Sequence, residues 1–314
     1  MAAVRHNRPT IIVFGGTIQA GVRTLDCEPM GYKAGDPVNI GDTFEAWGAF
    51  STGRISEAQC ADVVRHACPG AGACGGMYTA NTMSSILEVM GISLPYSAST
   101  PAVYDRKLYI LFAFHLFSSP AIAEKVQECL RAGEYMKDLL AKDIKPRDII
   151  TRSALLNAIT ITNILGGSTN AVLHLLAIAR SAEVPLTIAD FQSIRDRTPY
   201  LADLRPSGAY MMEDLHKAGG IPAILAYLLQ HPIGKTLLEW DGMTVTGKTM
   251  RENLEGVNPL VFEGPGAQSV IRPIERALKD TGHLTILRGS LAPGSAVAKL
   301  TGKEGLAFEV SMLD

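Results

Sequence analysis

Two cysteines in a glycine-rich loop have the residue types and spacing best suited to chemistry. Cys68 and Cys74 lie in the stretch HACPGAGACGGMYTANTM, residues 66–83, just before a helical pattern that runs to Met90. Glycines let the backbone approach a ligand closely, and a helix N-terminus favours a thiolate. Cys74 could therefore bind an iron–sulfur cluster or zinc, or act as a nucleophile.

The spacing of the two cysteines also leaves a structural interpretation open. Five residues separate Cys68 from Cys74, which matches neither the cysteine pair of a zinc knuckle nor a common redox pair. A cysteine buried in a glycine turn, without any ligand, is the alternative interpretation. In both cases Thr79, Asn81 or Thr82 is expected to cap the helix that follows.

A second construction of glycines, polar residues and a helix occurs in LGGSTNAVLHLLAIA, residues 165–179. Its helical pattern begins after Gly167, Ser168, Thr169 and Asn170. Backbone amides at a helix start form an anion site, and the two hydroxyl groups could bind a carboxylate or a phosphate. The alternative is that these polar residues are simply helix caps.

Three histidines are further candidates. His66 directly precedes the cysteine loop and could support a ligand there. His216 lies beside Glu213 and Asp214 on an expected short helix, which suits either catalysis or a solvated charged face. His174 is one position away from the apolar side of its helix, so a packed histidine is favoured over a metal ligand.

The elements that must position these residues alternate between helices and glycine-rich turns. The stretch Thr10–Phe14 is typical of a buried strand, capping patterns begin at Ser56 and Thr187, and Pro222 suits the first position of a helix. After His283, short apolar segments between Gly and Pro predict β structure. Helical or mixed stretches are expected at residues 43–53, 122–141, 146–164, 211–218 and 222–229.

The composition is that of a globular protein. The chain has 314 residues, 47% of them hydrophobic, and a net charge of −2 from 29 basic and 31 acidic residues. The lack of a basic excess argues against nucleic-acid or anionic-membrane binding, and the most apolar run, residues 108–117, is too short to span a bilayer. Five cysteines argue for a reducing compartment. We therefore expect a soluble, intracellular protein.

The motifs resemble those of a known family. The cysteine stretch is similar to the signature of the dihydroxy-acid dehydratase family, which also includes sugar-acid and phosphogluconate dehydratases. The similarity continues, in the family's order, in NRPTIIVFGGT, LGGSTNAVLHLLAIA, MMEDLHKAGGIPAIL, DGMTVTGKTM and GHLTILRGSLAPGSAVAKLTGKEG. This resemblance covers nearly the whole chain. It implies a large α/β domain, residues 1–280, followed by the beginning of a C-terminal β-barrel domain, residues 281–314.

The resemblance also implies a reaction and its cofactors. Family members remove water from 2,3-dihydroxy acids, such as 2,3-dihydroxy-3-methylbutanoate, and form 2-oxo acids for valine and isoleucine biosynthesis. A [2Fe–2S] cluster is held by cysteines, one of which corresponds to Cys74, whereas Cys68 corresponds to a non-ligand. Mg²⁺ binds beside the cluster. The family resemblance further implies a homodimer and, in eukaryotes, a mitochondrial or plastid location.

Departures from the family pattern lead to further expectations. The family's other cluster cysteines and a magnesium-binding Cys-Asp-Lys segment would precede Arg5, and its serine base and last magnesium carboxylate would follow Asp314. Residues 103–123 interrupt the pattern as an apolar insert. We therefore expect a fragment truncated at both ends. It would keep Cys74 as a cluster ligand, no catalytic or magnesium residue, and little activity on its own.

Other functions stay open at this point. One is a non-catalytic homologue that pairs with or regulates a full-length dehydratase, and another is a dehydratase of sugar acids. From residue chemistry alone, the cysteine loop also fits a thiolate metal protein that is unrelated to dehydration.

Overall fold

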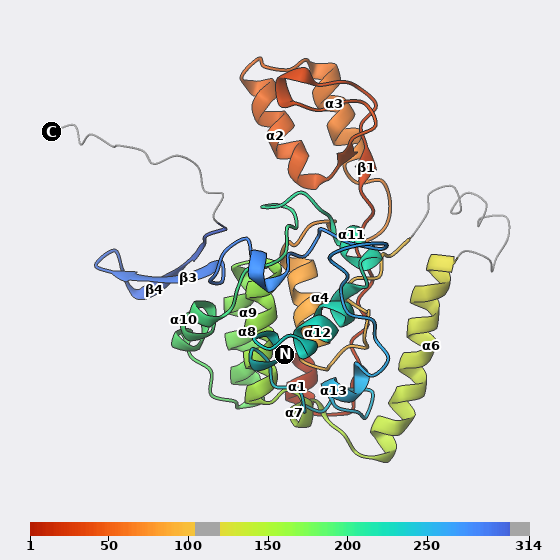
Figure 1. The fold of residues 1–314 in the computed structure, drawn as a ribbon, viewed down its shortest axis with the longest axis vertical. Helices are drawn as coiled ribbons and strands as arrows, with labels where there is room; N and C mark the ends of the chain where they lie inside the picture. The colour runs from red at the N-terminus through yellow and green to blue at the C-terminus, as the bar shows by residue number, and fades with distance from the viewer. Residues whose placement is uncertain (104–119, 302–314) are drawn as a thin grey trace.

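The protein has a helical body and a smaller lobe that projects from one end of it (Figure 1). The computed structural model describes residues 1–103 and 120–301. Within these residues helices are combined with short sheets, in agreement with the expected mixed fold class. The expected insert, residues 103–123, lies mostly outside the described residues. None of the helices in the described ranges is both long enough and apolar enough to cross a membrane.

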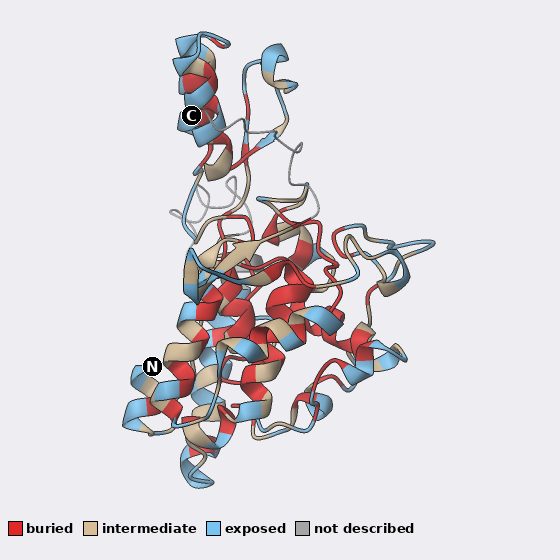
Figure 2. Ribbon diagram, turned by 90° about the vertical axis from the view of Figure 1, so that its left-hand side faces the viewer, coloured by how far each residue is buried: buried red, intermediate tan, exposed pale blue. Residues whose placement is uncertain are grey.

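The body is organised around helix α8 (Arg152–Leu165). Nearly every residue of α8 from Ala154 onward is buried, as expected of a helix with apolar residues on all sides. It packs against α4 (Thr79–Val89), α9 (Asn170–Ala182) and α10 (Ile188–Arg197). Figure 2 shows that the buried residues concentrate in the centre of the body.

Outer and shorter helices complete the body. Helix α6 (Pro120–Ala141) runs along the outer side of the body (Figure 1). Helix α11 (Met212–Lys217) is followed in the chain by α12 (Gly220–Gln230), and α12 packs on α4. The capping patterns predicted at Ser56 and Thr187 are confirmed. The remaining short helices of the body are α1 (Ala2–His6), α7 (Pro146–Ile149), α13 (Met250–Asn253), η2 (Gly234–Thr236) and η3 (Ile274–Arg276).

The described strands form two antiparallel pairs. In the body, β3 (Leu284–Gly289) pairs with β4 (Ala292–Lys299), and β3 lies against α10. This hairpin confirms the β structure predicted after His283. The other pair, β1 (Gly21–Val22) with β2 (Pro37–Val38), belongs to the lobe.

The lobe comprises residues 21–67 and has a separate core. After β1 come the turn η1 (Glu28–Met30) and β2, and then α2 (Ile40–Ser51) and α3 (Glu57–His66), which pack on each other. Because the cysteine loop follows α3 directly, the lobe leads straight into that loop. The core between its elements is made of mostly small side chains: Cys27, Val38, Ala46, Ala49, Ile55, Cys60, Val63 and Ala67.

The prediction of a strand at Thr10–Phe14 is wrong. The segment is coil and only partly buried, and loops supply its hydrogen-bond partners. The amide of Ile12 donates to the carbonyl of Ile92 (3.0 Å), and the amide of Phe14 donates to Ser97 Oγ (3.2 Å). An apolar run predicts that side chains will pack, but it does not specify which groups will satisfy the backbone.

Candidate functional site

The cysteine loop is fixed mainly through its backbone. The amide of Ile18 donates to the carbonyl of Ala73 (2.6 Å), and the amide of Ala73 donates to the carbonyl of Gly16 (2.9 Å). Gly72 has a φ of 128°, and a Cβ atom there would lie 2.5 Å from the backbone nitrogen of Ile18. Only glycine accommodates this dihedral angle and this close approach together. The glycines thus let the loop lie directly against the segment around Ile18.

Asn81 ties the loop to helix α4. Its fully buried side chain donates from Nδ2 to the carbonyl oxygens of Cys74 and Gly76. The prediction that Thr79, Asn81 or Thr82 caps α4 is wrong, because the helix begins without a side-chain cap bond. These polar side chains instead join segments that are distant in the sequence.

The segment Gly167–Asn170 lies against the start of α4. The hydroxyl oxygens of Thr79 and Ser168 are 3.1 Å apart, and Asn170 Nδ2 donates to Thr79 Oγ1 at 2.8 Å. The amide of Ser168 donates to Thr82 Oγ1 at 2.9 Å. The N-termini of α4 and α9 therefore meet, so the two glycine-rich constructions form one region of the structure.

The β3–β4 hairpin supports this second construction. His283 Nε2 lies 2.6 Å from the carbonyl oxygen of Gly167, and Lys299 Nζ donates to the carbonyl of Gly166 at 2.7 Å. Burial lowers the pKa of His283 to about 3 and that of Lys299 to about 8. A neutral imidazole with its proton on Nε2 can then donate to Gly167.

Sequence reasoning missed both of these supporting residues. The signal that could have found them is the Gly-Gly pair at the end of α8, where Gly166 adopts a φ of 68°. The last carbonyl groups of a helix need donors from elsewhere. The buried His283 and the partly buried Lys299 supply such donors.

The two thiols of the cysteine loop differ in exposure. Cys74 is half-buried and Cys68 is exposed. Burial raises the pKa of the Cys74 thiol, and the neighbouring Cys68 raises it further. The raised pKa means that the free thiol of Cys74 favours the protonated form over the thiolate expected from the sequence. Helix α4 begins only at Thr79, so Cys74 does not lie at the helix start. Across residues 1–103 and 120–301, no group of three or more His, Cys, Asp and Glu side chains could hold a metal ion.

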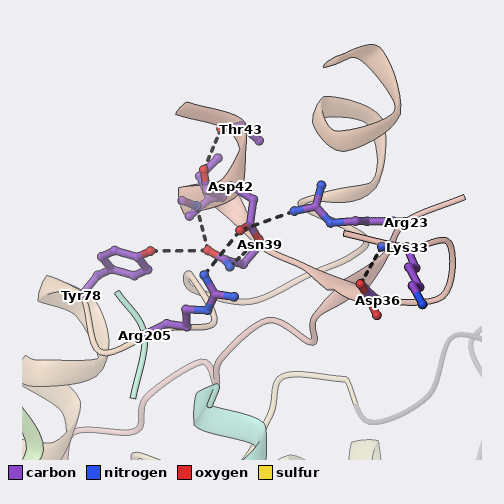
Figure 3. Close-up of polar contacts among 10 residues, drawn as sticks. Arg23, Lys33, Asp36, Asn39, Asp42, Thr43, Tyr78 and Arg205 are labelled. Carbon is purple, nitrogen blue, oxygen red and sulfur yellow. Dashed lines mark hydrogen bonds and ion pairs between the residues drawn. The ribbon is translucent and has the colours of Figure 1, made fainter. Parts of the chain in front are cut away.

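A polar network joins the lobe to the body beside the cysteine loop (Figure 3). Asp42 Oδ1 lies 3.5 Å from Arg205 Nη1 of the body and 3.5 Å from the buried Arg23 Nη2 of the lobe. The hydroxyl of Tyr78 donates to Asn39 Oδ1 at 3.4 Å, and burial raises the pKa of this phenol. These contacts connect the N-terminus of α2 to the residue just before α4, and no sequence pattern predicted them.

The candidate histidines lie on three helices and differ in their contacts. His66 Nδ1 lies 2.8 Å from the carbonyl oxygen of Asp62, one turn earlier in α3. His216 Nε2 lies 3.6 Å from Glu124 Oε2 of α6, and burial lowers the pKa of this imidazole. His174 is partly exposed on α9. The role predicted for His66 beside the cysteine loop stays a prediction.

Comparison with known proteins places these features in a family context. Residues 1–253 match the family model described as "Dihydroxy-acid/6-phosphogluconate dehydratase N-terminal", and residues 269–311 match the corresponding C-terminal model. The chain is 51% identical over 308 residues to a chloroplastic dihydroxy-acid dehydratase of Arabidopsis thaliana. It is 48% identical over 309 residues to a mitochondrial dihydroxy-acid dehydratase of Aspergillus terreus and to a dihydroxy-acid dehydratase of Francisella tularensis.

These matches cover nearly all of this chain but only part of each relative. They include 98% of the chain, against 45% of the Arabidopsis protein, 46% of the Aspergillus protein and 49% of the Francisella protein. The chain thus spans about half the length of the curated relatives it matches.

Proposed function

Because the chain belongs to the dihydroxy-acid/6-phosphogluconate dehydratase family, we propose that it contributes to a hydro-lyase that converts a 2,3-dihydroxy acid into a 2-oxo acid. The observation that supports this most is the meeting of the cysteine loop and the segment Gly167–Asn170 at the N-termini of α4 and α9. The relatives described above are all named dihydroxy-acid dehydratases. Their names favour a branched acid, such as 2,3-dihydroxy-3-methylbutanoate, over a sugar acid.

In this proposal the segment Gly167–Asn170 binds the carboxylate of the acid. Amide N–H groups at the start of α9 attract an anion, and the hydroxyl groups of Ser168 and Thr169 add donors. Ser168 is already oriented by Thr79 and by the amide of Asn170, 3.2 Å from its Oγ. A site that is ordered before the ligand arrives loses less entropy on binding.

Cys74 would supply one thiolate to the iron–sulfur cluster, and the exposed Cys68 would not be a ligand. A thiolate suits iron–sulfur chemistry, and the cluster, when bound, supplies a Lewis acid for the departing hydroxyl group. Among the described residues, no group of three or more His, Cys, Asp and Glu side chains could complete a metal site around this thiol. Further donors are therefore needed for the cluster and for Mg²⁺, and we expect little turnover from this chain alone.

The proposal extends to the pathway and to the compartment. A 2-oxo acid with a branched carbon chain is a precursor of valine or isoleucine, which fits the names of the relatives. Two of these relatives are named mitochondrial and chloroplastic. In a eukaryotic cell this protein would accordingly work in one of these organelles.

Ligand binding to the purified chain tests the substrate proposal. Saturation-transfer NMR with 2,3-dihydroxy-3-methylbutanoate should show binding that Ser168→Ala with Thr169→Ala abolishes, while Cys68→Ser leaves it unchanged. Stronger binding of 6-phosphogluconate would favour the sugar-acid alternative, and binding that survives the double substitution would refute the carboxylate site. Conversion of the acid to its 2-oxo acid at a full enzymatic rate would contradict the need for further donors.

A further inference from the structure

Glu88, near the end of α4, is a buried acid that binds the backbone of the following loop, residues 95–102. Its Oε1 accepts from the amide of Tyr96 at 2.9 Å, and its Oε2 accepts from the amide of Ala98 at 2.8 Å. Tyr96 adopts a φ of 72°, a left-handed conformation that is strained for a bulky residue. Glu88 thus holds the loop 95–102 in a conformation that is disfavoured without it.

Helix α6, on the outer side of the body (Figure 1), also binds this loop. Lys125 Nζ donates to the carbonyl of Ser97 at 2.9 Å and to Glu128 Oε2 at 2.7 Å. Glu128 is buried, and its Oε1 has no hydrogen-bond partner among the described residues. The buried carboxyl groups of Glu88 and Glu128 thus interact with each other and with a single ammonium group. Because burial and a like charge both disfavour ionisation, such a pair keeps a proton more readily than an exposed carboxyl group does.

The two carboxyl groups titrate as a pair. Burial and, to a smaller extent, the charge of Glu128 raise the pKa of Glu88 from its ordinary value of 4.5 to about 7, although the two amides and Lys125 act in the opposite direction. Groups that interact closely release their protons in steps that belong to both of them. Tyr96 stays neutral over this range, because burial raises the pKa of its phenol. The pair therefore holds one proton below about pH 7 and releases it above that pH.

Further charged groups lie around Glu128. Glu124 and Arg131 of α6 and His216 of α11 line a cavity of about 290 Å³ together with Glu128. Burial lowers the pKa of His216 below its ordinary value of 6.5, so this imidazole titrates at a lower pH than the pair. Residues 10–14, which contact the loop through an amide, and α12, which packs on α4, contain no Asp, Glu, Lys, Arg or His.

The loop 95–102 leads directly to the segment that supports the cysteine loop. The amide of Ala102 donates to the carbonyl of Thr17 at 2.9 Å, and Thr17 forms parallel bridges with both Pro101 and Ala73. The side chain of Thr17 is fully buried, and its Oγ1 donates to the carbonyl of Cys74 at 3.3 Å. The segment around Thr17 therefore lies between the two loops and is bonded to both of them.

We propose that Glu88 is a positioning residue for the cysteine loop, acting through the loop 95–102 and Thr17. Its carboxyl group shares one proton with that of Glu128. With this proton present, the two carboxyl groups and Lys125 carry no net charge, and the loop 95–102 stays in place. When the proton leaves, two carboxylates face one ammonium group, and the loop loosens its hold on Thr17. The proposal concerns only the position of the cysteine loop, so it holds whether or not that loop binds a metal.

Hydrogen exchange of backbone amides, measured by mass spectrometry on the purified chain without iron or substrate, tests the path. Glu88→Gln keeps an acceptor for one amide of the loop 95–102 and loses the other. Protection of the amides of Ile18 and Ala73 should fall roughly tenfold, the effect of about one hydrogen bond. The matched control is Asp190→Asn at the start of α10, where a carboxylate likewise accepts from a backbone amide, and it should leave these two amides unchanged. Unchanged protection in Glu88→Gln, or an equal fall in both variants, would overturn the proposal.

The pH dependence of the wild type tests the shared proton even if Glu88→Gln fails to fold. The folded pKa of Glu88 lies above its ordinary value, so the contribution of the protonated pair is present at low pH and is lost as the pH rises. Protection of Ala73, corrected for the intrinsic exchange rate at each pH, should fall roughly tenfold or more from about pH 5 to about pH 7. Glu128→Gln removes the like charge and lowers the pKa of Glu88, so the fall should be smaller in this variant. Constant protection in the wild type, or the same fall in Glu128→Gln, would contradict the shared proton.

Discussion

The two glycine-rich constructions that meet at the N-termini of α4 and α9 are held in place by different means. The cysteine loop pairs through its backbone with Gly16 and Ile18 and receives only a few side-chain bonds, chiefly from Asn81. The loop at Gly166–Gly167 is held instead by the side chains of His283, just before β3, and Lys299 of β4, more than a hundred residues later in the chain. The position of the thiol thus depends mainly on backbone pairing, whereas that of the second loop depends on side-chain donors.

The largest effect is expected where the backbone of the cysteine loop is closest to its neighbour. Gly72→Ala adds a Cβ atom 2.5 Å from the nitrogen of Ile18 at a φ of 128°. It should lower the free energy of unfolding by roughly 3 kcal/mol or more, from the dihedral strain and the clash together. Urea unfolding followed by circular dichroism measures this change.

Gly70→Ala is the matched control in the same loop. A Cβ atom at Gly70 would have nothing within 4 Å, so the change in the free energy of unfolding should stay within about 0.5 kcal/mol. Equal effects of the two substitutions would show that the loop is not positioned by close backbone pairing.

Asn81→Ala should have the next largest effect. It removes the Asn81 bonds to the carbonyl groups of Cys74 and Gly76. Each carbonyl keeps a second donor, Thr17 Oγ1 for Cys74 and the amide of Tyr78 for Gly76, so each lost bond should cost about 0.5–1.5 kcal/mol. We expect a total loss of about 1–3 kcal/mol and faster reaction of Cys74 with a thiol reagent. Ser84→Ala on the same helix, which loses one bond to the carbonyl of Asn81, should cost about 1 kcal/mol and leave that rate unchanged.

The second loop should respond to pH through His283. Its pKa of about 3 in the folded protein lies below the ordinary value of 6.5, so the unfolded chain takes up a proton first as the pH falls. Stability from the neutral imidazole is present above pH 6.5 and is lost toward pH 3. Between pH 6.5 and 5 the loss should reach about 2 kcal/mol, since one pKa unit corresponds to about 1.4 kcal/mol.

His283→Gln isolates this contribution, because glutamine can still donate to the carbonyl of Gly167 but does not titrate. The free energy of unfolding of the wild type should decline more steeply between pH 6.5 and 5 than that of the variant. Parallel pH profiles would mean that His283 does not stay neutral in the folded protein.

The smallest effect is expected at the junction of the two constructions. Ser168→Ala removes the contact with Thr79 Oγ1 and the bond from the amide of Asn170, at a partly exposed position. Such bonds contribute about 0.5–1.5 kcal/mol each, so thermal unfolding should show a loss of about 1 kcal/mol. A loss as large as that of Asn81→Ala would mean that the junction, rather than the loops, determines stability here.

Sequence patterns predicted most of what is local in this structure. The helices around Met83 and Val172, the caps at Ser56 and Thr187 and the β structure after His283 follow from residue spacing and capping chemistry. The failures involve partners that are distant in the sequence. The backbone of Thr10–Phe14 forms its hydrogen bonds with loops rather than with a strand. An apolar run does not indicate which groups will pair with its backbone, so the strand prediction failed.

The same reason explains what was missed at the site. Asn81 had the correct residue type for a cap, but two loop carbonyl groups compete for its amide. The Gly-Gly pair at the end of α8 indicates that donors are needed there, but which side chains supply them becomes evident only when α8 and the hairpin are packed together.

We propose that Cys74, and not Cys68, is the metal-binding thiol of the cysteine loop. An anaerobic equilibrium titration with Co²⁺, followed by the thiolate-to-metal absorption band, tests it without requiring a tightly held cluster. The band should appear for the wild type and for Cys68→Ser and should be lost in Cys74→Ser. A band that survives Cys74→Ser and disappears in Cys68→Ser would contradict the account.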